Sequence, residues 1–333
     1  MSSTRDAMSV LSIFPWNRIR QRTDMIGGVV IIELRWKLPN GVSVEIVHRN
    51  KTLLNASCLH PFAPSQLIMI DSDNSTELPP GIDCQDIIAF GTTGLVARYP
   101  NISKVVKIPH GGEQDARDRS AIESKIYQHF DQSRNRPSSI IRYFDTLDGN
   151  IILEFAENGD VRRFLRRREA PPESIILQWA QQAAEALAFC HSQGVLHGDM
   201  NCGNFFLDRH LNIKLGDFAG SSINGSPAKV CYSSSHQMPE NHSSTPDGII
   251  ILENTEIFAF GSALYEMVTG DEPYSEKDGS EIESLYQHNV FPDVTGLGPL
   301  GPVIIRCWNL DFHHMSEIAE CIETKRELPQ CNV

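Results

Sequence analysis

The sequence predicts an α+β fold with two lobes, a small antiparallel β-sheet lobe with one helix and then a larger, mainly helical lobe. In residues 82–156, short apolar runs alternate with turn-forming residues, as they do in antiparallel strands. In residues 157–333, apolar residues recur at helical spacing. The chain has 333 residues, 41% of them hydrophobic and 21% charged, and is therefore long enough to bury a sizeable core.

Residues 1–81 precede these lobes as an N-terminal extension. The runs "VVIIELRWKL" and "VSVEIVHR" predict two strands around the turn "PNG", because apolar residues alternate in the second run. The following "APSQLIMIDSDNSTELPPG" is rich in Pro, Ser, Asp and Gly, and we interpret it as a linker. The extension shows no motif with evident chemistry.

The small lobe is predicted over residues 82–156. "DIIAFGTTGLVARY" and "ISKVVKIP" predict strands, with a glycine turn inside the first run. "RDRSAIESKIYQHF" predicts a helix with Ile122, Ile126 and Phe130 on one face. "SIIRYFDTLDGNIILEFA" predicts two further strands, joined at Leu147-Asp148-Gly149.

The large lobe is predicted over residues 157–333. "ESIILQWAQQAAEALAFCHSQG" is rich in good helix formers and is expected to end at Gly194. "TEIFAFGSALYEMVTG" predicts a second apolar helix that also ends at a glycine. The arginines of "VRRFLRRRE" (Arg162, Arg163, Arg166 and Arg167) are interpreted as a solvated helix face, with binding of an acidic substrate or phosphate as the alternative.

Composition excludes several classes of partner. The formal net charge of −13 argues against a nucleic-acid-binding face. No apolar run reaches the length of a membrane span, and the N-terminus lacks the pattern of a secretory signal, so we expect no membrane partner. The eight cysteines form no C-x-x-C pair, which favours a reducing, cytoplasmic location.

The glycine turn and the strand that follows it suggest a phosphate site. A dinucleotide-binding motif needs a helix directly after its glycines, whereas Gly91 and Gly94 are followed by further strand residues. The bare backbone of this turn can lie over phosphates because no side chain blocks it. If Glu123 from the predicted helix binds Lys107 from the strand after the turn, the lysine is a fixed positive charge for the inner phosphates of a nucleotide.

A second group of polar residues lies in "VLHGDMNCGNFFLD" and "IKLGDFAGSS". Asn204 and Asp217 offer the oxygen ligands that Mg²⁺ prefers. Asp199 is then free to orient a hydroxyl group and to accept its proton. Any one of these residues could equally well belong to a structural loop. Five groups in this order along the chain are hard to obtain by chance: Lys107, Glu123, Asp199, Asn204 and Asp217.

Taken together, these motifs resemble the eukaryotic protein kinase family. The resemblance is carried in family order by "AFGTTGLV", "VVK", "ESKIY", "HGDMNCGN", "DFA", "MPE" and "EIFAFGSALYEMVTGDEPY", and covers roughly residues 82–325. "IIRCWNLDF" is similar to the tyrosine-kinase-like branch, and "AENGDVRRFL", "DFAGSS" and "FPDV" are most similar to fungal kinase-like sequences.

The resemblance implies a two-lobed protein-kinase-like fold and a role for each site residue. Asp199 is the catalytic base, Lys107 pairs with Glu123 and contacts the phosphates, and the resemblance adds ring contacts between His197, Phe218 and Tyr127. It implies that ATP and Mg²⁺ are the cofactors. The implied nucleotide-binding residues are Ala89, Gly91, Gly94, Val96, Lys107, Leu153, Glu154, Ala156 and Phe206, with Asn204 and Asp217 as the metal ligands.

The chain also departs from the family pattern. Gly198 replaces the arginine that answers a phosphorylated loop, so we interpret the hydroxyl-rich stretch after Asp217 as a polar loop. Asn201 and Gly203 stand where family members carry a cation, which predicts turnover slower by on the order of 10²-fold. Glu256 stands where an aspartate anchors the catalytic loop, which predicts a slightly displaced loop.

The leading hypothesis is an ATP-dependent protein kinase, serine/threonine-directed, with a protein substrate. One alternative is a small-molecule phosphotransferase, because "LHGDMNCGN" also resembles the loop of aminoglycoside and choline kinases. The other is a catalytically weak pseudokinase that acts as a scaffold. It is supported by the missing cation at Asn201 and Gly203 and by Glu256 in place of aspartate.

Overall fold

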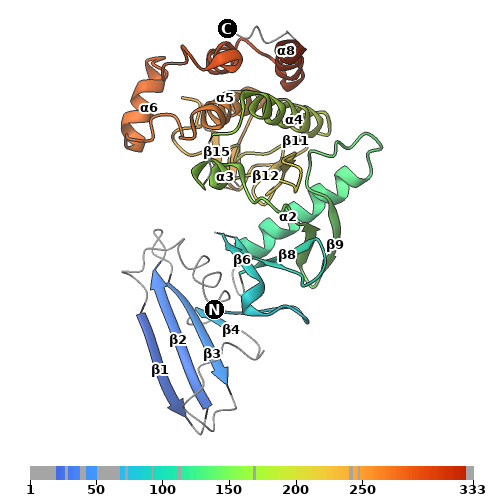
Figure 1. Cartoon of the computed structure of the whole chain (residues 1–333), viewed down its shortest axis with the longest axis vertical. Coiled ribbons are helices and arrows are strands. Elements are labelled where there is room, and N and C mark those ends of the chain that lie inside the picture. Colours follow the sequence, from blue (N-terminus) through green and yellow to red (C-terminus); the bar gives the residue numbers. More distant parts are fainter. Residues whose placement is uncertain are drawn as a thin grey trace. The chain divides into compact units, whose positions relative to one another are not determined.

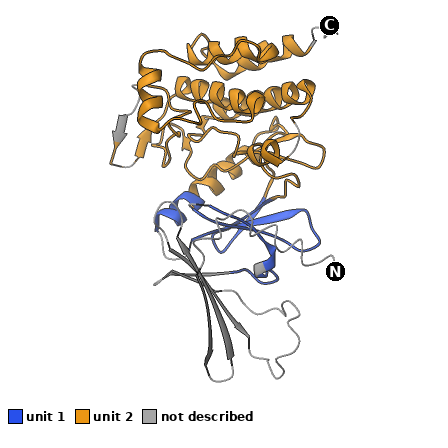
Figure 2. Ribbon diagram, turned by 60° about the vertical axis from the view of Figure 1, so that its left-hand side comes forward, with its two compact units in different colours: residues 1–120, 144–153 blue, residues 121–143, 154–333 orange. Residues whose placement is uncertain are grey.

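The computed structural model describes residues 20–26, 29–37, 43–50, 68–71, 74–91, 93–110, 114–167, 170–239, 243–246 and 248–327. The chain divides into two compact units, which Figure 2 shows in blue and orange. The first comprises residues 1–120 and 144–153 and contains antiparallel sheets; the second comprises residues 121–143 and 154–333 and is mainly helical. The predicted α+β fold is therefore confirmed, while the domain boundaries predicted after residues 81 and 156 stay predictions.

The extension contributes a five-stranded antiparallel sheet in the order β1-β2-β3-β4-β5. Its strands are β1 (Arg20–Ile26), β2 (Val29–Lys37), β3 (Ser43–Asn50), β4 (Ile68–Asp71) and β5 (Asn74–Glu77). The two strands expected here are β2 and β3, whereas their turn lies outside the described residues. The stretch expected to be a linker instead supplies β4 and β5, because "LIMI" is an apolar run that can add to a sheet edge.

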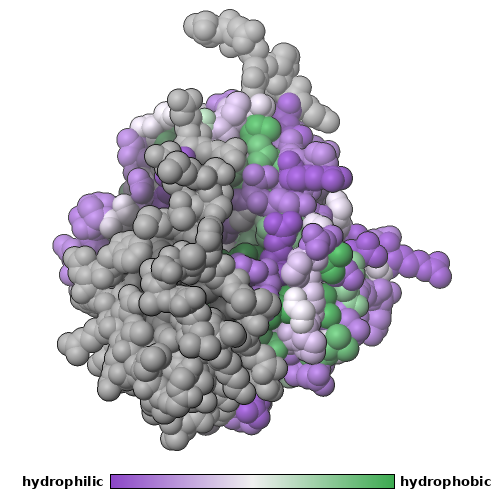
Figure 3. Space-filling model, turned by 60° about the horizontal axis from the view of Figure 1, so that its bottom comes forward, coloured by the Kyte–Doolittle hydropathy of each residue, from purple (hydrophilic) through white to green (hydrophobic). Residues whose placement is uncertain are grey.

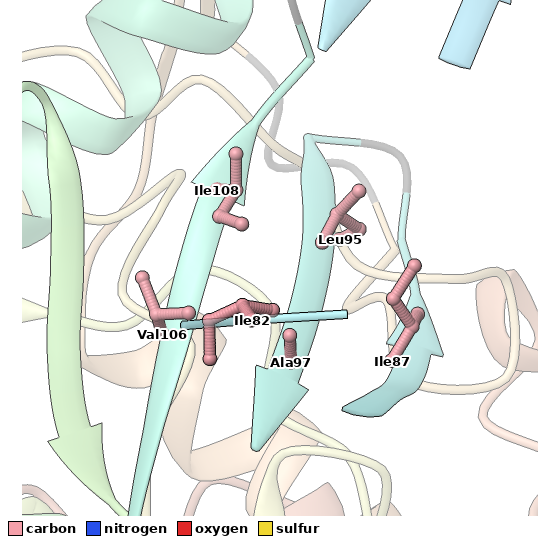
Figure 4. Packing of buried hydrophobic residues seen from close by; sticks show 6 residues of the cluster. All are labelled: Ile82, Ile87, Leu95, Ala97, Val106 and Ile108. Carbon is pink, nitrogen blue, oxygen red and sulfur yellow. The ribbon is translucent and has the colours of Figure 1, made fainter. Parts of the chain in front are cut away.

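A second sheet has the order β6-β7-β8-β10-β9. A short 3₁₀ helix, η2 (Cys84–Asp86), leads into β6 (Ile87–Phe90), β7 (Gly94–Arg98), β8 (Lys104–Pro109), β9 (Tyr143–Leu147) and β10 (Asn150–Glu154). Asp148 and Gly149 both have positive φ, +52° and +80°, as a tight hairpin turn between β9 and β10 requires. One face of β6, β7 and β8 buries a cluster of apolar side chains (Figure 4): Ile82, Ile87, Leu95, Ala97, Val106 and Ile108.

The second unit is mainly helical, and two of its helices end at glycines as predicted. The helices are α2 (Gln114–Asp131, which begins in the first unit), α3 (Val161–Arg167), α4 (Glu173–Ser192), α5 (Glu253–Thr269), α6 (Gly279–Gln287), η3 (Gly298–Leu300), α7 (Gly301–Trp308) and α8 (Met315–Glu327). Gly194 (φ +71°) follows α4 and Gly270 (φ +85°) follows α5, as predicted.

Three short antiparallel pairs connect these helices: β11 (Val195–Leu196) with β14 (Ser222–Ile223), β12 (Phe205–Leu207) with β13 (Ile213–Leu215), and β15 (Ser243–Thr245) with β16 (Gly248–Ile250). Helix α5 is mostly buried and packs against α3, α4 and α7 (Figure 1). A helix that is apolar on nearly all sides serves as a core element. It therefore offers a rigid base for the loops that contact it.

Replacement of Gly261 in α5 by alanine is expected to lower the free energy of unfolding by about 1–3 kcal/mol. A methyl group at this position would lie 2.7 Å from Cβ of Cys307 and 3.2 Å from Cδ1 of Trp308. The clash outweighs the gain of about 1 kcal/mol that alanine brings within a helix. Urea unfolding of Gly261→Ala measures the change. Gly91→Ala serves as the control because its methyl would meet only an ordinary contact of 3.6 Å, and equal stability of the two variants would contradict the prediction.

The surface shows no sign of a membrane-spanning element within the described part of the chain. None of the helices described is both long and apolar enough to cross a bilayer. Figure 3 shows one face, on which the described residues are mostly hydrophilic with small apolar groups between them, as on water-exposed protein surfaces.

Candidate active site

The loop between β11 and β12 carries the acid singled out in the sequence. His197 at its start is fully buried, donates from Nε2 to the carbonyl oxygen of Gly216 at 3.0 Å, and packs its ring on Phe218 at 5.0 Å. Gly198 follows with φ +80°, a backbone conformation that favours glycine. The buried imidazole of His197 fixes the start of the loop, and the backbone turn at Gly198 sets the position of Asp199.

Two amide side chains hold the carboxylate of Asp199. Asn204 donates from Nδ2 to the carbonyl oxygen of Asp199 at 2.6 Å and to Oδ2 at 3.0 Å. Asn201 donates from Nδ2 to Oδ1 at 3.0 Å, and its own Oδ1 accepts from the backbone N–H of Gly203 at 2.8 Å. The structure thus fixes the orientation of this carboxylate. The sequence indicates Asn201 only as the residue that replaces a family cation, although its spacing of two residues from Asp199 is compatible with this contact.

The hairpin of β12 and β13 brings the two predicted metal ligands close together. Phe205 pairs with Leu215, and the backbone N–H of Gly216 donates to the carbonyl oxygen of Asn204 at 3.1 Å. Asp217, the next residue, has φ +63°. Because Nδ2 of Asn204 donates to Asp199, its Oδ1 is the atom left to bind a cation.

Oxygen donors of this kind fit Mg²⁺. Within the described residues no group of three or more His, Cys, Asp or Glu side chains could by itself hold a metal ion. The predicted site therefore depends on an amide oxygen and on oxygens supplied by the nucleotide.

Helix α2 adds a carboxylate and an aromatic ring to the helical unit. Glu123 is fully buried, and Tyr127, one turn later, packs edge-on against Phe218 at 5.3 Å. Burial, followed by the charges of Glu123 and Asp217, raises the pKa of the Tyr127 hydroxyl well above its usual value. Both carboxylates therefore lie near this hydroxyl, and the expected ring contacts between His197, Phe218 and Tyr127 are present.

The first unit holds most of the predicted nucleotide-binding residues. The turn between β6 and β7 closes through a hydrogen bond from the N–H of Gly91 to the carbonyl oxygen of Gly94 at 2.8 Å. A Cβ at Gly94 would lie 2.1 Å from the carbonyl oxygen of Ile108, so this position requires glycine. Val96 pairs directly with Lys107 on β8. Ala89 lies on β6 and Leu153 on β10.

The remaining predicted residues belong to the helical unit. Phe206 lies on β12, and Ala156 is buried directly after β10. The carboxylate of Glu154 is bound by Lys214 Nζ at 3.0 Å and by the backbone N–H of Arg142 at 3.1 Å, and the backbone N–H of Glu154 donates to the carbonyl oxygen of Arg142 at 2.8 Å. Because Lys107 and Glu123 belong to different units, their pairing stays a prediction.

Glu256 of α5 anchors the loop just before Asp199. Its Oε1 accepts from the N–H of Gly198 at 2.7 Å and from the hydroxyl of Tyr232 at 3.1 Å, and its Oε2 faces Nε2 of His191 at 2.7 Å. The carboxyl group is fully buried. Burial raises its pKa, but the hydrogen bond and charge of His191 outweigh burial, and the net shift is downward. Glu256 is therefore ionised and binds the loop backbone directly.

The free energy of unfolding is expected to fall by about 3 kcal/mol between pH 6.5 and pH 9.5 because of His191. Burial alone would lower its pKa, but hydrogen bonds to Glu253 and Glu256 raise it to about 9. A raised pKa stabilises the fold fully below the unfolded value of about 6.5 and ceases to do so as pH rises through the folded value. Urea unfolding across this range measures the slope. His191→Gln should remove it, and an unchanged slope in this variant would contradict the assignment.

A second glutamate of α5 anchors the loop after Asp199. Glu266 accepts from the N–H of Cys202 at 3.2 Å, and the N–H of Arg162 donates to the carbonyl oxygen of Cys202 at 3.3 Å. The guanidinium of Arg162 binds both Glu266, at 2.9 Å to Oε2, and Glu272. The interpretation of Arg162 as part of a solvated face is therefore wrong. It is paired because it lies in the first turn of α3, which packs against α5, whereas Arg166 and Arg167 are exposed.

The hydroxyl-rich stretch after Asp217 is mostly inaccessible. Four of its seven candidate hydroxyl residues are buried: Ser221, Ser222, Tyr232 and Ser235. Ser226, Ser233 and Ser234 are exposed. The interpretation as a polar loop therefore fits the three exposed serines, whereas the other four hydroxyl residues are buried.

Comparison with known proteins identifies the architecture. Residues 97–320, more than half of the chain, match the family described as protein kinase domain. The chain belongs to the protein kinase family. Its antiparallel sheet β6–β10 and its mainly helical part agree with the two-lobed protein-kinase fold. The tyrosine-kinase-like branch and the likeness to fungal sequences stay predictions.

Several curated protein kinases are similar to this chain. It is 33% identical to testis-specific serine/threonine-protein kinase 2 of Mus musculus, over 54% of this chain and 53% of the relative. It is 27% identical to serine/threonine-protein kinase Nek4 of Mus musculus, over 71% and 28%, and 28% identical to serine/threonine-protein kinase GIN4 of Saccharomyces cerevisiae, over 57% and 17%. The matched region thus spans about half or less of each relative.

Proposed function

We propose that this chain is an ATP-dependent, serine/threonine-directed protein kinase that uses Mg²⁺. The arrangement of Asp199 carries the proposal: two amide groups orient its carboxylate, and two buried glutamates of α5 hold the loop on either side of it. A base fixed in this way can orient a substrate hydroxyl and accept its proton. Most of the remaining catalytic effect is positioning and charge stabilisation.

The chain's own residues have distinct tasks in this proposal. Lys107 contacts the inner phosphates and Glu123 orients it, while the turn at Gly91 and Gly94 presents its backbone to the phosphates. Val96, Leu153, Ala156 and Phe206 supply apolar contacts to the adenine, and the backbone carbonyl oxygen of Glu154 accepts a hydrogen bond from it. When bound, Mg²⁺ neutralises phosphate charge, and Asn204 Oδ1 and Asp217 would hold it there.

Slow turnover is part of the proposal. Asn201 directs its amide to Asp199, and Gly203 has no side chain, so neither position places a cation at the transferring phosphoryl group. We expect a cost on the order of 10²-fold in rate relative to a kinase that has this cation. The same observation supports the second candidate, a pseudokinase scaffold that binds nucleotide without turnover.

A protein substrate is supported by a surface cavity in the helical unit. The cavity has a volume of about 270 Å³ and is lined by Ser234, Gln237, Met238, Pro239, Glu283, Tyr286 and Gln287. It lies between the segment after Asp217 and helix α6, where an extended polypeptide has room for a side chain. A small-molecule phosphotransferase has no need for such a second contact.

Radiolabel transfer from ATP tests the function. The purified chain is incubated with labelled ATP and Mg²⁺, with either a peptide library or a panel of amino alcohols, and products are identified by mass spectrometry. We expect label on peptide serine or threonine, lost with chelator and in Lys107→Met. Label on amino alcohols alone would establish the small-molecule alternative. Nucleotide binding by thermal shift without any transfer would establish the scaffold.

A further inference from the structure

Backbone hydrogen bonds join the segment of residues 228–239 to other parts of the helical unit. Ala228 exchanges two backbone hydrogen bonds with Ile249, at 2.8 and 2.9 Å. The N–H of Lys229 donates to the carbonyl oxygen of Gly220 at 2.8 Å. Just before the segment, the buried hydroxyl of Ser221 donates to the carbonyl oxygen of His197 at 2.8 Å. These bonds hold the segment in a defined conformation beside the catalytic loop.

Position 198 offers this segment no charged partner. Gly198 has φ +80°, which a larger residue adopts only with strain. A Cβ built there would lie 3.2 Å from Ile251 and 3.6 Å from both Ala228 and Val230, all of them apolar side chains. A phosphate group on this segment therefore meets apolar side chains and no positive charge at position 198.

Tyr232 supplies a different link to the same place. Its side chain is buried, and its hydroxyl donates to Oε1 of Glu256 at 3.1 Å. The same oxygen accepts from the N–H of Gly198 at 2.7 Å, directly before Asp199. Burial and the charge of Glu256 raise the pKa of the Tyr232 hydroxyl well above its usual value, so the hydroxyl keeps its proton and remains a donor. A bond to an ionised acceptor is among the stronger hydrogen bonds in proteins.

The geometry points to Tyr232 as a positioning residue that couples the 228–239 segment to the catalytic loop through Glu256, without phosphorylation. One carboxylate oxygen joins the tyrosine hydroxyl to the backbone next to the base, so movement of the segment loosens the loop. The inference rests on the proposed function, because this coupling affects a reaction only if Asp199 acts as its base.

Hydrogen exchange of the full chain, followed by mass spectrometry, tests the coupling. In Tyr232→Phe, which keeps the ring and removes the donor, we expect peptides covering residues 195–204 and 228–239 to exchange about ten-fold faster or more. Tyr274→Phe is the matched control, because its hydroxyl donates at 3.0 Å to Val290, which lies outside both peptides. We also expect kcat to fall in Tyr232→Phe with KM for ATP unchanged. Treatment of the wild type with a phosphatase should change neither exchange nor kcat.

Each result decides the matter. Unchanged exchange of residues 195–204 in Tyr232→Phe, or faster exchange there after phosphatase treatment, would overturn the inference. Faster exchange in a chain that transfers no phosphate would support the coupling and refute only the proposed function. If the variant does not fold, the wild type in low urea still gives an answer: a shared opening free energy of the two peptides supports the coupling, and separate ones overturn it.

Discussion

Replacing Asp199 with asparagine is expected to lower the rate of phosphoryl transfer by about 10²- to 10⁴-fold, the usual contribution of a positioned general base. Both carboxylate oxygens accept from amide groups, Oδ1 from Asn201 and Oδ2 from Asn204. An asparagine at position 199 would direct its own amide group at one of these donors whichever way it turns. The variant therefore loses both the base and its orientation.

Binding of ATP should be retained in Asp199→Asn, because the proposed phosphate and adenine contacts lie on other residues. Initial rates at saturating ATP, with KM for ATP measured alongside, separate the two effects. Asp311→Asn is the matched control, since Asp311 is exposed in the turn between α7 and α8. A variant that keeps more than a tenth of wild-type activity would show that Asp199 is not the base.

Replacing Glu256 with alanine is expected to lower the free energy of unfolding by about 3–5 kcal/mol, as when one partner of a buried ion pair is removed. The N–H of Gly198 and the hydroxyl of Tyr232 lose their acceptor, and His191 loses one of the two carboxylates that it contacts and keeps Glu253. Burial then opposes the charge on this histidine. The pH dependence expected for His191 should shrink in the same variant.

Chemical unfolding in urea measures this loss. Glu320→Ala on α8 is the control, because that glutamate is exposed. Glu256→Gln should fall between the two, since its amide oxygen can still accept from Gly198 but carries no charge for His191. A loss below about 1 kcal/mol in Glu256→Ala, the range of an exposed ion pair, would show that the buried carboxylate is not an anchor.

Those parts of the fold and the site that depend on short stretches of sequence were predictable. The short apolar runs "FFL" and "IKL" form β12 and β13, whose pairing places Asn204 beside Gly216. The stops at Gly194 and Gly270 follow from the left-handed backbone that ends many helices. The family motifs supplied the order of these elements.

The resemblance indicated that Glu256 takes the place of the aspartate that anchors the loop, but the sequence alone does not pair it with Gly198, 58 residues away. The pair of Arg162 and Glu266, 104 residues apart, was not predictable. Arg162 and Arg166 look alike in the sequence, yet only the first meets a glutamate of α5. The strands β4 and β5 were missed for a related reason, since a short apolar run becomes a strand only where a partner edge is present.

The two glutamates of α5 stand ten residues apart, about 15 Å along the helix axis, and both bind main-chain N–H groups. Every amino acid except proline has such a group. The hydrogen bond from residue 202 to Glu266 therefore does not involve the side chain at that position, whereas the fully buried Cys202 thiol makes a separate bond to the carbonyl oxygen of Ala263 at 3.4 Å. Proline is the substitution at residue 202 that the hydrogen bond to Glu266 excludes.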